Sequence, residues 1–309
     1  MTQIQENTQQ SHRFQINLKG MIELLSDHLY SSPDVFLREL LQNSVDAISM
    51  RDNECEAPFE PEIQVYVEEG ERVTLFDSGV GLTEDEVHRF LATIGQSIKR
   101  VRAQEMGVAQ GGGDYLGQFG IGLLACFMVS DEIEVYTRSA RTPDAPTLHW
   151  LGRADGTYDI SVVEDEMTPG TRVELKSKSG KTRHFTTEYI EDRLTHFGRF
   201  LKTPISLVSG EVSRPLNREP LWRRQDVSYD VWREESLELG QEVFGERFSD
   251  VIYLESEAAG LSGVAFVTDR PAKSSVKRRD HVYLKGMLLS DKVDQLLPSW
   301  AFFTRAIIN

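Results

Sequence analysis

One predicted helix carries polar side chains at a spacing that could do chemistry. Within residues 36–48, Glu39, Asn43 and Asp46 are spaced i, i+4 and i+7, which places them on one arc of a helix at about 100° per residue. A carboxylate in such a set can act as a general base, and an amide oxygen can bind a hard cation. An ordinary solvated face has the same pattern, so the helix alone leaves both readings open.

A second candidate is Asp77, which ends a predicted strand and is followed by Gly79 and Gly81. Glycines at this spacing suit a place where the backbone approaches a ligand closely. An ionised aspartate only accepts hydrogen bonds, so it could take a donor such as the exocyclic amine of adenine. A tight turn capped by Asp would show the same residues.

The third candidate is the glycine-rich stretch 117–122 (GQFGIG), which leads directly into an apolar run. Glycines permit positive φ, and free amides at a helix start form an anion-binding concavity. The spacing is not that of a dinucleotide-binding fingerprint, and the chain has no Walker sequence. A glycine-rich loop without a phosphate is the alternative.

Local signals predict the elements that position these residues. Ser32, with Pro33 and Asp34 after it, predicts the start of a helix that reaches about residue 50. Thr83 and Glu86 predict a capping box, for a helix through residue 91. Alternation predicts a hairpin of strands 63–67 and 72–77, further strands at 132–138, 147–151, 158–163 and 171–176, and helices at 14–30, 121–129 and 188–200.

The composition of the whole chain limits its class. It has 309 residues, a net charge of −15 and two cysteines, which indicates two domains without a disulfide framework. The acidic balance argues against nucleic-acid binding. No signal peptide or membrane span is evident, so we expect a cytoplasmic protein. Cys126 lies in an apolar run and is expected to be buried and inert.

Prolines and polar residues place a domain boundary near 210–222. Beyond it, we expect strands at 251–255, 263–268 and 281–284 and a short helix at 291–297. Residues 301–309 are markedly apolar, which leads us to expect a chain that stops partway through its second domain. Residues 95–122 are rich in glycine without a steady period, which is typical of a long loop that acts as a lid.

Taken in order, these motifs resemble the heat-shock protein 90 chaperones, within the ATPase superfamily shared with gyrase, mismatch-repair proteins and histidine kinases. The string Phe-Leu-Arg-Glu-Leu at 36–40 is typical of the chaperone branch, and the short spacer indicates a bacterial type. The matching segments are 36–40 with Asn43 and Asp46, 77–82, Thr93-Ile94-Gly95 with Ser97, 117–122, Gly170-Thr171 and Pro220-Leu221-Trp222.

The resemblance implies a role for each candidate. Glu39 would be the general base that activates water, and Asn43 would bind Mg²⁺. Asp77 would accept from the adenine amine, with Thr171 supporting it through water. The resemblance also implies that Asp46 lies near the pocket's edge and that Gly81 and Leu82 line the pocket of the adenine base. Backbone amides would wrap the phosphates at Gly117, Gln118, Phe119, Gly120, Ile121 and Gly122. The other implied nucleotide-binding residues are Gln96, Ser97 and Leu123.

Three positions depart from the family pattern. Where this chain has Phe90 and Gln96, the family often has Asn and Lys, and where it has Leu123 the family usually has Phe. These departures bear on phosphate affinity and on closure of the lid, which the resemblance places at about 95–118. The set formed by Glu39, Asn43 and Asp77 matches.

The resemblance also implies the fold and the activity. We expect an α+β chain: a two-layer α/β sandwich ATPase domain over 1–215, and a partial α/β middle domain over 216–309. A catalytic Arg of the middle domain would lie roughly ten residues beyond Asn309, so hydrolysis would be weak here. The implied function is an ATP-dependent chaperone that binds ATP or ADP with Mg²⁺, acts on unfolded clients and forms a homodimer. A nucleotide-gated scaffold without turnover, or another ATPase of the superfamily, is the alternative.

Overall fold

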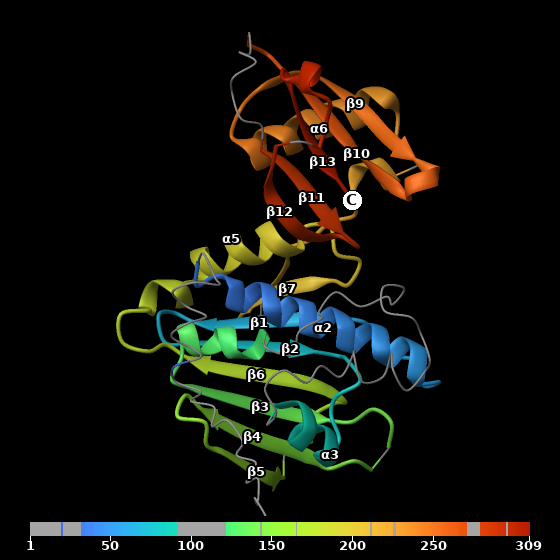
Figure 1. Ribbon diagram of the computed structural model, residues 1–309. Coiled ribbons are helices and arrows are strands. Elements are labelled where there is room, and N and C mark those ends of the chain that lie inside the picture. The colour runs from blue at the N-terminus through green and yellow to red at the C-terminus, as the bar shows by residue number, and fades with distance from the viewer. Residues whose placement is uncertain are drawn as a thin grey trace, which may run out of the picture.

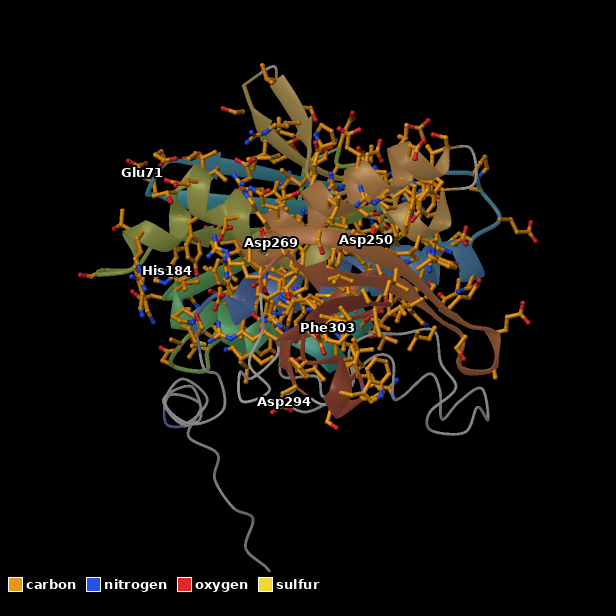
Figure 2. All side chains as sticks on the ribbon, turned by 90° about the horizontal axis from the view of Figure 1, so that it is seen from above. Glu71, His184, Asp250, Asp269, Asp294 and Phe303 are labelled. Atoms are coloured by element: carbon orange, nitrogen blue, oxygen red, sulfur yellow. The ribbon has the colours of Figure 1, made fainter. Side chains whose placement is uncertain are left out.

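Two β-sheets organise the chain. The computed structural model describes Gly20 and residues 32–91, 122–142, 144–164, 166–210, 212–224, 227–270, 279–294 and 296–309. In this part, one sheet has the strand order β5-β4-β3-β6-β2-β1-β7-β8 and the other the order β12-β11-β13-β10-β9. Figure 1 shows the second sheet beyond the α5 side of the first. From above, Asp250 of the second sheet lies near the centre of the molecule and Glu71 of the first at its edge (Figure 2).

The first sheet is antiparallel except for one pair, in which β1 runs parallel to β7. Its strands are β1 (Ile63–Glu68), β2 (Arg72–Asp77), β3 (Glu132–Arg138), β4 (Thr147–Arg153), β5 (Tyr158–Val163), β6 (Gly170–Lys176), β7 (Ile205–Ser209) and β8 (Val212–Pro215). The expected hairpin and the next four strands are therefore confirmed, whereas β7 and β8 were not predicted. With helices on the sheet, this confirms the α+β class.

Helices accompany the first sheet. They are α2 (Val35–Glu54), α3 (Glu84–Glu86), the π-helical turn η2 (Val87–Leu91), the 3₁₀ helices η3 (Gly122–Met128) and η4 (Thr182–Phe185), and α5 (Thr187–Gly198). Figure 1 shows α2 crossing the sheet over β1 and β2. Its apolar stripe, which includes Phe36, Leu37 and Leu41, is fully buried, as a period of 3.6 requires.

Two of the predicted helix starts can be compared with the structure. The capping box is confirmed, because Thr83 Oγ1 accepts from Glu86 N and the Glu86 carboxylate accepts from Thr83 N. The expected Ser32 cap is wrong: Asp34 occupies the cap position of α2, without a side-chain cap bond. The Asp34 carboxylate lies instead 3.4 Å from Arg193 Nη1 of α5, so an ion pair between helices replaces the local cap.

The second sheet packs against one long helix. Its strands are β9 (Phe248–Ser256), β10 (Leu261–Thr268), β11 (Asp280–Leu284), β12 (Met287–Val293) and β13 (Thr304–Ile308), and the helices are η5 (Leu221–Arg223), α6 (Tyr229–Phe244), η6 (Glu257–Ala259) and η7 (Ser299–Ala301). The α6 helix approaches β10 so closely that a Cβ on Gly240 would lie 2.6 Å from the Phe266 ring. The three strands predicted here are confirmed.

The helix expected at 291–297 is wrong, because residues 287–293 form β12 and pair with β11. The turn between the two strands explains the difference. Lys285 and Gly286 have φ values of 53° and 87°, and a two-residue turn of this kind sends a strand back along its neighbour. The α6 helix was not predicted, although Ser228 at its start and Gly245 at its end are ordinary capping signals.

Aromatic side chains join the second sheet to the α5 end of the first. The Phe200 ring lies 4.9 Å from that of Trp222 and 4.8 Å from that of Tyr283 on β11. The β11–β12 turn reaches the same place, because a Cβ on Gly286 would lie 2.0 Å from the Phe200 carbonyl oxygen. The core is therefore continuous between the two sheets.

Candidate functional site

Asp77 is a buried carboxyl group held by three elements. It is the last residue of β2 and is 4% exposed. Its Oδ2 accepts from the Ser44 hydroxyl of α2 at 3.2 Å, and its Oδ1 accepts from the Gly79 backbone N–H at 2.9 Å. Burial raises the pKa of Asp77 from 3.8 to about 7, against the opposing effects of these two donors, the Thr171 backbone N–H and the charge of Arg51. This carboxyl group therefore changes its charge near neutral pH.

The loop after Asp77 is fixed by α2 on one side and β3 on the other. Val80 N donates to the Ala47 carbonyl at 3.0 Å, and the Val80 carbonyl accepts from Ala140 N at 2.8 Å. Leu82 N donates to Thr137 Oγ1 at 2.9 Å. The loop thus presents Asp77 from a rigid backbone.

Close packing explains the glycines of this loop. A Cβ on Gly79 would lie 2.6 Å from the Ala47 Cβ, and Gly81 has a φ of +62° and its Cβ would lie 2.0 Å from the Arg138 carbonyl oxygen. The sequence predicted that these glycines let the backbone approach a ligand. In the structure, they let the loop approach α2 and β3.

Thr171 lies beside Asp77, as its register shows. The two residues face each other across β6 and β2, and Thr171 Oγ1 lies 3.2 Å from Thr137 Oγ1. Gly170 brings the strands close together, since its Cβ would lie 2.1 Å from the Asp77 carbonyl oxygen. The structure therefore brings together Asp77 and Thr171, which lie on neighbouring strands although they are far apart in the sequence.

Glu39 lies against the start of η3. Its Oε1 is 3.3 Å from Arg38 Nη2. Its Oε2 lies so close to Gly122 that a Cβ on this glycine would be 2.2 Å from it. The Glu39 side chain is 17% exposed. Cys126 is buried, as expected. Its burial and, to a smaller extent, the charge of Glu39 raise the pKa of its thiol. The structure thus joins the predicted base to the last glycine of the predicted phosphate loop.

The other polar residues of α2 differ in exposure. Asn43 is exposed one turn after Glu39, so its amide is open to a ligand on that side of the helix. Asp46 is buried, with 1% of its surface exposed. Leu82 and Leu123 are half-buried against the core.

The remaining predicted residues lie outside the described part of the chain. These are Gln96, Ser97, Gly117, Gln118, Phe119, Gly120 and Ile121, the lid at 95–118, and most of the helix expected at 14–30. Gly122 and Leu123 are the first described residues after that gap.

Two residues near Asp77 were missed by the sequence reasoning. Ser44 follows Leu40 and Leu41 and precedes Ile48 on the buried stripe of α2, and a polar residue at such a position needs a partner. Its burial was therefore predictable, although the partner was not. Arg51, in the last turn of α2, donates to the Ser78 carbonyl at 2.8 Å.

Two surface cavities lie away from Asp77 and Glu39. Cavities of about 370 and 320 Å³ share Lys176, Ser177 and Lys178 at the other end of β6, and neither is lined by Asp77 or Glu39. In the described part of the chain, no three His, Cys, Asp or Glu residues gather as metal ligands. No helix among the described residues is long and apolar enough to cross a membrane.

The chain is similar to one family of ATPases and to several curated proteins. Residues 30–182 match the family model of histidine kinase-, DNA gyrase B- and HSP90-like ATPases. The chain is 26% identical to the mitochondrial heat shock protein 75 kDa of Rattus norvegicus, over 100% of the chain and 45% of that protein. It is 24% identical to the same protein of Bos taurus, over 96% of the chain and 43% of that protein.

A bacterial relative is similar to the same extent. The chain is 24% identical to the chaperone protein HtpG of Photorhabdus laumondii, over 97% of the chain and 52% of that protein. The chain therefore spans about half the length of the curated relatives that it matches.

Proposed function

Because the chain belongs to the heat-shock protein 90 family, we propose that it binds ATP or ADP with Mg²⁺ and functions as the nucleotide-binding part of an ATP-dependent molecular chaperone. Slow hydrolysis of ATP would drive conformational cycling on unfolded client proteins. The observation that carries this proposal is the Asp77 carboxyl group, buried at a strand end and held by Ser44 and Gly79.

Asp77 is suited to select adenine. A buried carboxylate accepts hydrogen bonds and cannot donate them, so it matches the exocyclic amine of adenine and opposes the carbonyl oxygen that guanine and hypoxanthine carry at the same place. The backbone bonds of Val80 and Leu82 hold the loop still. Affinity for adenine should therefore depend on the ionised form of Asp77.

Glu39 is suited to act as a general base. One oxygen is paired with Arg38 and the other lies against Gly122, so the carboxylate is oriented toward the start of η3. Amides at a helix start attract phosphate, and a carboxylate beside them can take a proton from a water that attacks there. Glu39 would take the proton, while the loop before Gly122 would hold the phosphates.

The residues present fit a nucleotide-bound Mg²⁺. Such an ion takes its ligands mainly from water and substrate phosphates, with one or two protein oxygens. The exposed Asn43 amide, one turn from Glu39, offers such an oxygen. When bound, Mg²⁺ neutralises phosphate charge, which an acidic chain with a net charge of −15 cannot do by its composition.

The wider assignments follow from the same proposal. Residues 1–215 form the nucleotide-binding domain, and residues 216–309 belong to a middle domain. Client proteins, a homodimer and a cytoplasmic location are part of the proposed function. The similarity to a mitochondrial heat shock protein and to a bacterial chaperone protein supports the chaperone part of this proposal.

Titration calorimetry with ADP, IDP and Mg²⁺ tests the proposal. IDP has a carbonyl oxygen in place of the amine of ADP, so we expect it to bind about tenfold to hundredfold more weakly, because Asp77 then faces another acceptor. Equal affinity for ADP and IDP would contradict the assignment of Asp77 to the base. Absence of Mg²⁺–ADP binding would contradict the proposed function itself.

A further inference from the structure

Arg51 joins the two backbone segments that flank Asp77. Its Nη1 donates to the Ser78 carbonyl oxygen at 2.8 Å and to the Pro169 carbonyl oxygen at 3.0 Å. Ser78 follows Asp77 in the loop, and Pro169 precedes Gly170 at the start of β6. One guanidinium nitrogen therefore connects the end of β2 to the beginning of β6.

Neighbouring groups hold this guanidinium and its acceptor in place. The Arg51 Cζ atom lies 4.3 Å from the centroid of the Phe59 ring, a distance at which the ring attracts a cation. Ser78 is held by the residues that precede β1. Its Oγ donates to the Glu60 carbonyl and accepts from Glu62 N, each at 2.9 Å. The link between Arg51 and the loop is therefore part of an ordered network.

The groups that face the Asp77 carboxyl come from three elements. Helix α2 supplies the Ser44 hydroxyl and the positive charge of Arg51, the loop supplies the Gly79 N–H, and β6 supplies the Thr171 N–H. Each of them lowers the pKa of Asp77 against the effect of burial. Cys55 faces Arg51 from the end of the same helix. Arg51 thus acts on Asp77 through charge as well as through the backbone.

We propose that Arg51 is a positioning residue for adenine recognition, which clamps the Ser78 and Pro169 carbonyls so that Asp77 and Thr171 stay side by side for the base. This inference rests on the proposed function. Arg51 does not itself contact the base: its effect passes through the two carbonyl groups and through the charge that it places near Asp77.

The variant Arg51→Gln tests this role, with Arg193→Gln as the matched control. Arg193 lies on α5 and is paired with Asp34 at the start of α2, so it also joins two elements, but at the end of α2 away from Arg51. Calorimetry with Mg²⁺–ADP between about pH 6 and pH 9 measures affinity and its pH midpoint. For Arg51→Gln we expect an affinity about tenfold lower at pH 7 and a midpoint at higher pH. Arg193→Gln should keep the wild-type midpoint.

A purely structural role would give a different result. If Arg51→Gln lowered the melting temperature but kept the wild-type affinity and pH midpoint, the inference would be wrong. Should Arg51→Gln fail to fold, Arg51→Lys takes its place. It keeps the charge and loses the guanidinium fork, so we expect an unchanged midpoint and an affinity about threefold lower. Wild-type affinity of Arg51→Lys would overturn the role of the guanidinium.

A second measurement separates this inference from the proposed function. NMR titration of the Asp77 carboxyl in the free chain needs no nucleotide. A higher Asp77 pKa in Arg51→Gln than in the wild type supports the inference, and an equal pKa contradicts it. If the wild type binds no Mg²⁺–ADP at any pH, the proposed function falls, and this titration alone decides whether Arg51 controls Asp77.

Discussion

The Asp77 carboxylate accepts a hydrogen bond from the Ser44 hydroxyl at 3.2 Å, although the two residues are 33 positions apart and both are buried. The bond joins the end of β2 to the middle of α2. A buried carboxyl group pays a large desolvation cost when it ionises. The donors around Asp77 reduce that cost enough for its charge to change near neutral pH.

Replacing Ser44 should weaken this arrangement. The variant Ser44→Ala removes one donor, so we expect a higher Asp77 pKa and a loss of about 1 kcal/mol in the free energy of unfolding above pH 7. NMR titration and urea unfolding measure the two effects. Ser49→Ala on the same helix is the control, because the bond that the Ser49 backbone carbonyl accepts from Asn53 Nδ2 is kept in this variant. Equal Asp77 pKa values in both variants would argue against the role of Ser44.

The stability of the chain should fall as the pH rises through neutrality. The folded-state pKa of Asp77 is about 7 and its ordinary value is 3.8, so between these values the folded state binds more protons than the unfolded state. The contribution is fully present below about pH 4 and is lost as the pH rises through about 7, with a total of about 4 kcal/mol.

Comparing Asp77→Asn with the wild type isolates this contribution. The amide does not titrate, so its free energy of unfolding should vary less with pH between about 5 and 7.5. Urea unfolding at a series of pH values measures the difference. Parallel pH profiles for the two proteins would mean that Asp77 has an ordinary pKa in the folded state.

The glycine at position 81 should tolerate no side chain. Gly81→Ala places a Cβ 2.0 Å from the Arg138 carbonyl oxygen at a φ of +62°, so we expect a loss of more than about 3 kcal/mol in the free energy of unfolding. Gly210→Ala is the control, since its φ is +60° and its Cβ would meet no described residue within 4 Å apart from its chain neighbours, and it should lose about 1 kcal/mol. Similar losses for both would show that the loop can move away from β3.

Substitutions of Glu39 and Gly122 should reduce ATP hydrolysis more than they reduce nucleotide affinity. Glu39→Ala removes the proposed base, and we expect single-turnover ATP hydrolysis to fall at least about a hundredfold while Mg²⁺–ADP affinity changes less than about threefold. Gly122→Ala should resemble it in turnover, because its Cβ would take the place of the Glu39 Oε2. If Glu39→Ala lost binding as well, Glu39 would have a structural role.

Local patterns predicted much of the first sheet and of its site. The hairpin of β1 and β2 alternates in polarity, and the Thr83 capping box depends on residues three positions apart. Such signals are contained in short stretches, which is why they can be found without the fold. Helical spacing and a strand end made Glu39, Asn43 and Asp77 candidates, and the family resemblance then gave each of them a role.

The missed features depend on contacts between distant parts of the chain. Arg51 could be recognised only after the fold placed Ser78 and Pro169 near each other, because Pro169 is 118 positions from Arg51. At the β11–β12 turn, Lys285 adopts a φ of 53°. Residues other than Gly, Asn and Asp rarely have a positive φ, so a lysine in the sequence does not indicate such a turn. The last residues of β12 were therefore predicted as the start of a helix.

The most direct test of the account compares ADP and IDP on the wild type and on Asp77→Asn by calorimetry with Mg²⁺ at about pH 8, where Asp77 is ionised. The wild type should prefer ADP by at least about tenfold. Asp77→Asn should bind ADP more weakly and lose most of that preference, because its amide can donate to the IDP carbonyl. Unchanged ADP affinity and unchanged preference in Asp77→Asn would contradict the proposal that this carboxylate recognises the base.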